Sequence, residues 1–314
     1  MHAVAHDHSG HHPSQASESR LLLAAALTIA TMLAEAVGGW ISGSLALFSD
    51  AAHMLVDAFA LLLAWAGAHF ARRPADDRRS FGYARLEVLA GYSNSILQLF
   101  LVVWIAVEAV SRLMRPEPIL SGIMLGVALV GLVVNLIVLG ALGSHQHDDL
   151  NVAGARLHVL GDLLGSAGAV AAALLVRYSG WLQADPLVSL LVSALILGSA
   201  WNLLRRSAHI LLEGVPDGIE TAHVAETVRR ESGVVDVHHV HVWQLAGGRR
   251  MATLHARLVD GMETASALAA MQRVLREHFH ISHATIQIEG GDCAAGDCQE
   301  PAHAAHAGHD DHAH

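Results

Sequence analysis

Residues 45–71 read LALFSDAAHMLVDAFALLLAWAGAHFA, an apolar stretch with two aspartates and a histidine in its first half. About 20 apolar residues in a helix cross the hydrocarbon core of a bilayer. The stretch is therefore long enough to span a membrane. Because ionisable side chains are costly against lipid, Asp50, His53 and Asp57 are expected to face the protein interior or a water-filled path.

Apolar runs of this length recur along the chain. Charged or turn residues separate the runs, the tightest break being Gly43-Ser44. An even number of spans puts both termini on one side of the membrane, and most arginines near the span ends flank that side, so both termini are expected in the cytoplasm. We expect a multi-pass protein of a bacterial inner (plasma) membrane. The six runs are Leu21–Ile41, Leu45–Ala71, Leu86–Met114, Ile119–Leu142, Val152–Arg177 and Pro186–Leu204.

The composition narrows the classes of partner. The 314 residues are 53% hydrophobic and 15% charged, with a net charge of -10 and no lysine. This balance argues against a nucleic-acid partner, which requires a basic face. The 24 histidines cluster at both ends and in one internal loop, a composition that favours metal handling.

After the sixth span the pattern becomes that of a small soluble domain. A helix, two strands across Gly247-Gly248, a second helix and a final strand are expected, which is an αββαβ unit. The fold class is an α-helical membrane protein with six transmembrane helices and a small α+β domain. The predicted elements are Ile219–Glu231, Val235–Trp243, Met251–Val259, Thr264–Phe279 and Ala284–Glu289, and the predicted parts are a His-rich tail (1–20), the membrane domain (21–212), the soluble domain (213–290) and a His- and Cys-containing tail (291–314).

Two spans carry the same metal-binding pattern. His53 and Asp57 are four residues apart in the second span, and so are His158 and Asp162 in the fifth. Residues four apart share a helix face, so two opposed helices offer two imidazoles and two carboxylates, a tetrahedral set suited to Zn²⁺. A packed histidine is the alternative for a single site, but the repetition favours metal. Asp50 is an outer-shell ligand, a proton acceptor or the polar start of a helix, and these alternatives stay open.

Other polar residues also lie within the spans. Hydrogen bonding between helices is the favoured interpretation for them, ahead of a role in the ion path. They are Glu35, Asn94, Gln98, Glu108 and Asn135.

The ordered motifs resemble the cation diffusion facilitator family of zinc transporters, in its His-rich branch of zinc, cadmium and cobalt efflux proteins. The resemblance covers nearly the whole chain and implies a cytoplasmic domain similar to a ferredoxin-like metallochaperone, a homodimer, and metal export in exchange for protons. Because histidine must lose its proton to bind metal, we assign the exchange mainly to His53 and His158. The motifs are Ser44 to Leu47, Asp50 to Asp57, Phe81-Gly82-Tyr83 with Arg85 and Glu87, His158 to Ser166, and Leu212 to Pro216.

The soluble domain offers further candidate ligands, because family members often bind additional zinc there. His239 and His241 are expected on one strand face, with His238 pointing the other way; solvated surface histidines are the alternative. Cys293 and Cys298 are spaced more widely than a CxxC motif, so a metal site there needs histidines or a second chain. The domain candidates are His239, His241, His255, His283 and Glu289.

These patterns predict a secondary transporter and not an enzyme. Its expected substrate is Zn²⁺, with Cd²⁺ or Co²⁺ as further candidates, and its expected partners are divalent metal ions, protons, the lipid bilayer and a second copy of the chain. No organic cofactor is expected, and Zn²⁺ is also a candidate regulatory ligand. An intramembrane metalloenzyme would keep an open metal position for water, which four protein ligands do not leave. A membrane-anchored metal buffer or sensor does not require six spans with buried ligands.

Overall fold

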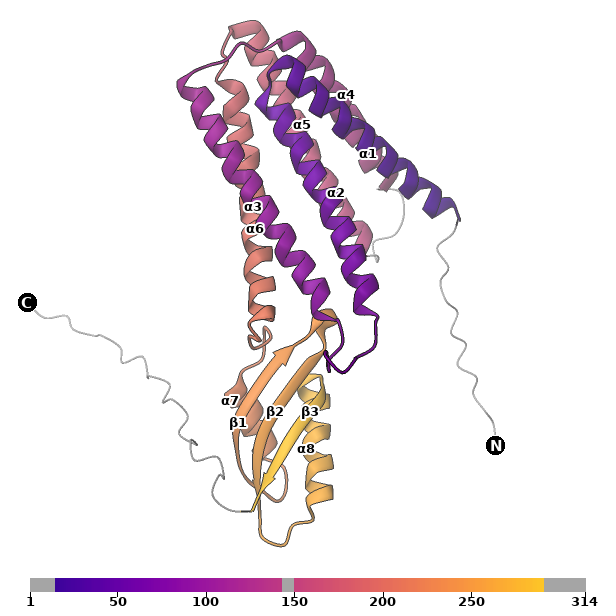
Figure 1. Ribbon diagram of the computed structural model, residues 1–314, viewed down its shortest axis with the longest axis vertical. Coiled ribbons are helices and arrows are strands. Elements are labelled where there is room, and N and C mark those ends of the chain that lie inside the picture. The colour runs from indigo at the N-terminus through magenta and orange to yellow at the C-terminus, as the bar shows by residue number, and fades with distance from the viewer. Residues whose placement is uncertain (1–14, 143–149, 291–314) are drawn as a thin grey trace, which may run out of the picture. The chain divides into compact units, whose positions relative to one another are not determined.

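The computed structural model describes residues 15–142 and 150–290, and the side chains at 15–24, 141–142 and 150–158 lie outside that description. Figure 1 shows a set of long helices and a smaller part that contains a sheet. Within the described ranges, six helices are long and apolar enough to cross a membrane, which confirms the predicted spans. They are α1 (Gln15–Ser42), α2 (Leu45–Ala71), α3 (Arg85–Met114), α4 (Ser121–Leu142), α5 (Leu150–Ser179) and α6 (Ala184–Leu211).

The turn between α1 and α2 is held by two other helices. Gly43 has a φ of 72°, a left-handed conformation that glycine adopts without steric cost. Arg112 of α3 donates to the Gly43 carbonyl at 2.6 Å. Asp185 of α6 accepts from the Ser44 hydroxyl at 2.6 Å and from the Leu45 N–H at 2.7 Å. The carboxylate thus caps the first turn of α2, whose N–H groups have no partner within the helix.

Small residues allow the helices to approach closely. Ala128 of α4 and Ala169, Ala172 and Ala173 of α5 are buried together. Gly165 of α5 lies against Asp50 of α2, because a Cβ at position 165 would be 2.9 Å from a carboxylate oxygen of Asp50. Close backbone approach through small residues is the usual way in which membrane helices pack. It brings α2 and α5, the two helices with the HxxxD pattern, into direct contact.

The loop between α2 and α3 is organised around Asp76. The Tyr83 hydroxyl donates to one carboxylate oxygen at 2.7 Å, and the N–H groups of Arg78 and Arg79 donate to the other at 2.9 and 2.8 Å. These bonds, that of Tyr83 first, hold the pKa of Asp76 below its ordinary value because they favour the charged carboxylate. Tyr83 of the FGY motif therefore has a structural role in this loop.

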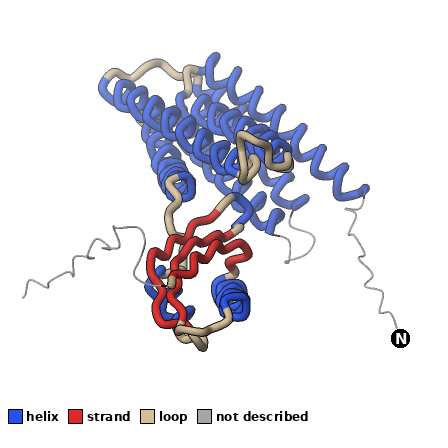
Figure 2. Tube along the Cα trace, turned by 60° about the horizontal axis from the view of Figure 1, so that its bottom comes forward, coloured by secondary structure: helices blue, strands red, loops and turns tan. Residues whose placement is uncertain are grey.

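The C-terminal part is the predicted αββαβ unit, which is confirmed. Its three strands form one sheet (Figure 2). The strand order is β1-β2-β3, with β1 antiparallel and β3 parallel to β2. Val224 and Val228 of the first helix and Met271 and Leu275 of the second pack with Leu254 in the core. The opposite face of the sheet carries polar side chains. The elements are α7 (Thr221–Arg229), β1 (Val234–Gln244), β2 (Arg250–Leu258), α8 (Thr264–Phe279) and β3 (Ile281–Glu289).

Candidate metal centres

The first candidate centre begins on α2, where the helical period places His53 and Asp57 on one face. The Nε2 atom of His53 lies 3.3 Å from the Oδ2 atom of Asp57. Gln98 of α3 donates to the other carboxylate oxygen of Asp57 at 3.0 Å. Both predicted ligands are about one-sixth exposed, so most of each side chain is buried.

The second half of this centre is on α5. Asp162 is 4% exposed and lies three residues before Gly165, where α5 contacts α2. His158 belongs to α5, but its side chain lies outside the described residues, so the full four-ligand geometry remains a prediction. Asp50 itself is buried, lies against Gly165 and shares a hydrogen bond with the Ser166 hydroxyl.

The remaining intramembrane polar residues divide into two groups. Two form the interhelical hydrogen bonds expected of them, Gln98 with Asp57 and Asn135 with Ser166. Glu108 has a partner within its own helix, because it accepts from Arg112 of α3. Gln98 also touches a predicted ligand, so it belongs to the centre, a role for which its sequence position gave no signal. In contrast, both carboxylate oxygens of Glu35 and the amide oxygen of Asn94 lack a hydrogen-bond partner among the described residues.

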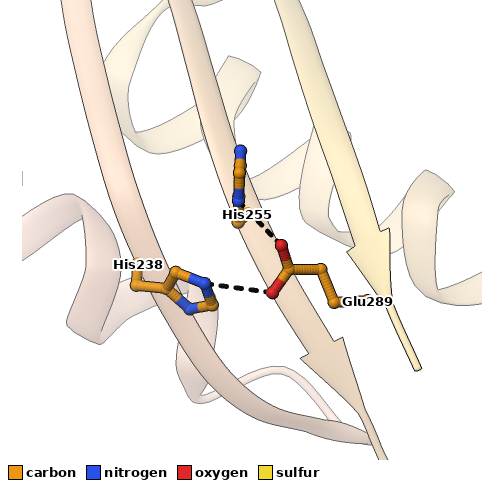
Figure 3. Close-up of side chains that lie close together, drawn as sticks. All are labelled: His238, His255 and Glu289. Atoms are coloured by element: carbon orange, nitrogen blue, oxygen red, sulfur yellow. Dashed lines mark ion pairs between the residues drawn. The ribbon is translucent and has the colours of Figure 1, made fainter. Parts of the chain in front are cut away.

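The second candidate centre lies on the polar face of the sheet (Figure 3). His238 Nε2 is 3.1 Å from one carboxylate oxygen of Glu289, and His255 Nδ1 is 2.9 Å from the other. Neither contact has hydrogen-bond geometry. One ligand atom from each residue lies within 4.8 Å of the others, and within the described side chains this is the only such group of three or more. Two imidazole nitrogens and a carboxylate oxygen that converge in this way are an arrangement that a divalent cation satisfies.

The local backbone explains why His238 joins this centre. Strand β1 has a bulge between His238 and His241, and His239 has a φ of 50°. The extra residue breaks the two-residue alternation, so His238 pairs with His255 across the ladder. The expectation that His238 points away from the ligand face is wrong. Asp236 contacts the other ring nitrogen of His238 at 3.1 Å, a carboxylate position that orients metal-binding histidines.

The other candidate ligands of this domain lie in three different situations. The His239 ring is 5.1 Å from that of His255, so it borders the centre. His241 and His283 are exposed and lie outside the group formed by the described side chains. Cys293 and Cys298 lie outside the described residues, as do the His-rich tails and the loop around His145.

Comparison with known protein families gives one match for the membrane part of the chain and another for its C-terminal part. The cation efflux transmembrane domain matches residues 21–212, and the cytoplasmic domain of cation efflux proteins matches residues 216–290. The chain belongs to the cation efflux (cation diffusion facilitator) family. This confirms the resemblance drawn from its motifs and identifies it as an integral, multi-pass membrane protein with a cytoplasmic α/β domain.

Similar proteins cover almost the full length of this cation efflux chain. It is 44% identical over 301 residues to the zinc transporter ZitB of Escherichia coli, with 94% of this chain and 96% of the relative covered. It is 40% identical over 294 residues to the metal cation efflux system protein CzcD of Cupriavidus metallidurans, with 93% of each covered. A cadmium, cobalt and zinc/H(+)-K(+) antiporter of Bacillus subtilis is 35% identical over 285 residues, with 89% and 92% covered.

Proposed function

We propose that this protein is a secondary transporter that exports Zn²⁺, with Cd²⁺ and Co²⁺ as further substrates, from the cytoplasm in exchange for protons. The observation that carries the proposal is the His53–Asp57 pair, which faces into the bundle on the helix that contacts α5. The relatives named for zinc, cadmium and cobalt transport support the same substrates. The protein is not proposed to be an enzyme.

The proposed transport site consists of His53, Asp57, His158 and Asp162. Two imidazole nitrogens and two carboxylate oxygens suit tetrahedral Zn²⁺ better than the harder Mg²⁺ or Mn²⁺ ions, which prefer oxygen. The two aspartates offset the charge of the ion inside the membrane. Gln98 fixes one oxygen of Asp57, which leaves the other oxygen on the side of His53.

Proton exchange follows from the chemistry of these ligands. Histidine binds metal only when neutral, so metal and protons compete for the same nitrogen atoms. A site that is protonated on one side of the membrane and metal-loaded on the other couples the two fluxes. Both termini are proposed to face the cytoplasm, in the inner membrane of a bacterium, because most span-end arginines flank that side.

The cytoplasmic domain is proposed to bind regulatory Zn²⁺ at His238, His255 and Glu289. One chain supplies three ligand atoms there, so a water molecule, His239 or a second copy would complete the shell. A homodimer that shares this polar sheet face is the proposed assembly. No organic cofactor is proposed, since Zn²⁺ serves as substrate and as regulatory ligand.

The test is zinc flux in vesicles reconstituted with the purified full-length protein. We expect a zinc-sensitive dye inside the vesicles to respond when the interior is more acidic than the medium, and the response to disappear when an ionophore collapses the proton gradient. Asp162→Ala should give the response of protein-free vesicles. Zinc binding without any gradient-dependent flux would instead identify a membrane-anchored metal buffer or sensor.

A further inference from the structure

The connection between α2 and α3 is basic and belongs to the same part of the molecule as the cytoplasmic domain. Residues 64–92 and the described chain from residue 205 form one compact unit. Because α2 ends at Ala71 and α3 begins at Arg85, residues 72–84 lie where two spans leave the bilayer. This connection contains four arginines and two aspartates. The carboxylate of Asp76 is already bonded within the loop.

A basic cavity of about 570 Å³ lies between this connection and the adjacent ends of β2 and β3. It is lined by Arg73 from the connection and by Arg249 and Arg250 where β2 begins, together with His283, and by no described acidic residue. The volume is in the range of about 300–1,000 Å³ that is usual for ligand sites. Three arginines without a carboxylate favour an anion such as a phosphate group.

The three arginines keep hydrogen-bond donors available. Arg250 gives one of its five N–H groups to the Phe279 carbonyl at 2.8 Å, which fixes the position of its guanidinium. The guanidinium of Arg73 lies over the Phe70 ring, 4.7 Å from the centroid, a contact that uses its face and leaves the N–H groups at its edge. Arg249 is exposed, and its side chain has no ion-pair or hydrogen-bond partner among the described residues.

An apolar surface lies directly beside the basic cavity. A second cavity of about 440 Å³ shares residues 80–84 and Leu245 with the first. Glu213 is the one described acidic residue that lines it, and this carboxylate is paired with Arg85 at 2.6 Å. A free phosphate ion is too small to use both cavities, whereas a molecule with an anionic group and a hydrocarbon chain reaches both. The apolar lining of the second cavity consists of Phe81, Leu86, Leu89, Leu211, Trp243 and Leu245.

We propose that these two cavities bind an anionic phospholipid of the cytoplasmic leaflet, with its phosphodiester group among Arg73, Arg249 and Arg250 and an acyl chain along Leu86 and Leu89. Anionic lipids of this leaflet attract basic residues that lie near the membrane surface. The bound lipid joins the α2–α3 connection to the tips of β2 and β3, which are far apart in sequence. The site is separate from both candidate metal centres and does not depend on which ion is carried.

Lipid binding to the full-length protein tests this site. The purified protein in detergent is titrated with phosphatidylglycerol or with zwitterionic phosphatidylcholine, and native mass spectrometry counts the lipids bound per chain. We expect one phosphatidylglycerol per chain at concentrations at which phosphatidylcholine does not bind. The double change Arg73→Gln and Arg249→Gln should raise the concentration for half-saturation at least about tenfold, because each arginine near an anionic headgroup contributes about fivefold.

A matched variant controls for the loss of charge. The double change Arg72→Gln and Arg276→Gln removes one exposed arginine from the same connection and one from α8, and neither residue lines either cavity. This variant should bind phosphatidylglycerol like the wild type. The single change Arg249→Gln, at a side chain without a described partner, should weaken binding about fivefold even if the Arg73 and Arg249 double variant folds poorly.

Three results would overturn the proposal. Equal affinity for phosphatidylglycerol and phosphatidylcholine would show that the anionic headgroup is not recognised. Displacement of phosphatidylglycerol by millimolar inorganic phosphate would make the basic cavity a site for a free anion. An equal loss in the Arg72 and Arg276 variant would assign the effect to net charge. Because none of these measurements involves zinc flux, the proposed transport function is tested separately.

Discussion

The two candidate metal centres differ in the backbone that builds them and in their access to water. The membrane centre lies on helices, with His53 and Asp57 one turn apart and Asp162 buried on a neighbouring helix. The cytoplasmic centre lies on an open sheet face, where a bulge brings His238 to His255 and Glu289. The two predicted carboxylates of the first match the charge of a divalent ion, whereas the second has one carboxylate among its three candidate ligands.

This difference indicates two tasks. A charge-balanced site inside a bilayer can hold a divalent ion where solvent is scarce, which an ion in transit requires. A three-ligand site at a surface leaves a coordination position for a further group, so occupancy can alter how the domain associates. The membrane centre should therefore be essential for transport, and the cytoplasmic centre should adjust it.

The strongest test removes one carboxylate from each centre. We expect Asp57→Ala to reduce zinc flux to the level of protein-free vesicles, because the site loses a ligand and half of its negative charge. Glu289→Ala should keep its basal flux, since the ion path does not include it, and should lose only the rise of flux at high cytoplasmic zinc. Equal losses in the two variants, at equal protein levels and thermal stability, would erase the proposed division of tasks.

A second test changes the identity of a ligand in the membrane centre. His53→Asp replaces a nitrogen donor with oxygen, which favours harder ions. We expect the ratio of zinc to manganese transport to fall by about tenfold, equivalent to about 1.4 kcal/mol between the two ions. Competition between the metals in the vesicle assay measures this ratio. An unchanged ratio would mean that His53 does not contact the ion.

A third test concerns the hydrogen bond that holds Asp57. Gln98→Leu preserves the side-chain volume but removes the donor, and loss of such an outer contact typically weakens metal binding by about 10- to 100-fold. We expect the zinc concentration at half-maximal flux to rise accordingly, with little change in the maximal rate. Ile96→Ala, at an exposed position of the same helix, serves as the control. A rise shared by both variants would assign the effect to packing of α3.

The positions of the helices could be predicted from the sequence, whereas the residues of the cytoplasmic centre could not. A span must exceed a minimum apolar length, and helix α8 begins and ends where its pattern predicts, at Thr264 and Phe279. The spacing of His53 and Asp57 likewise translates directly into a shared face, because the helical period is fixed. Sequence could not reveal that Gln98 contacts Asp57 or that Glu35 lacks a partner, since both depend on how separate helices rotate against each other.

Strand alternation is less secure because one inserted residue reverses it. The prediction for β1 placed His239 and His241 on the ligand face, whereas the structure puts His238 there. In the structure Val237 and Val242 are both buried, and an odd separation between two core residues requires a bulge between them. Three histidines and Val240 lie between these valines, and their order alone did not show where the bulge is.

The last test has the smallest expected effect on transport. It decides whether His238, or His239 and His241, lie on the ligand face of β1. In full-length protein that also carries Asp57→Ala, which removes the membrane site, zinc binding reports on the cytoplasmic centre. We expect His238→Ala to weaken this binding by at least about tenfold, because the ring contacts Glu289 and is oriented by Asp236. The matched change His241→Ala removes an exposed imidazole of the same strand and should leave the affinity unaltered.

With Asp57 restored, His238→Ala should blunt the rise of flux at high cytoplasmic zinc, by mass action on the bound form, without lowering the basal flux. If His241→Ala proves the more damaging of the pair, the bulge does not define the ligand face, and the simple alternation of the strand is the correct description.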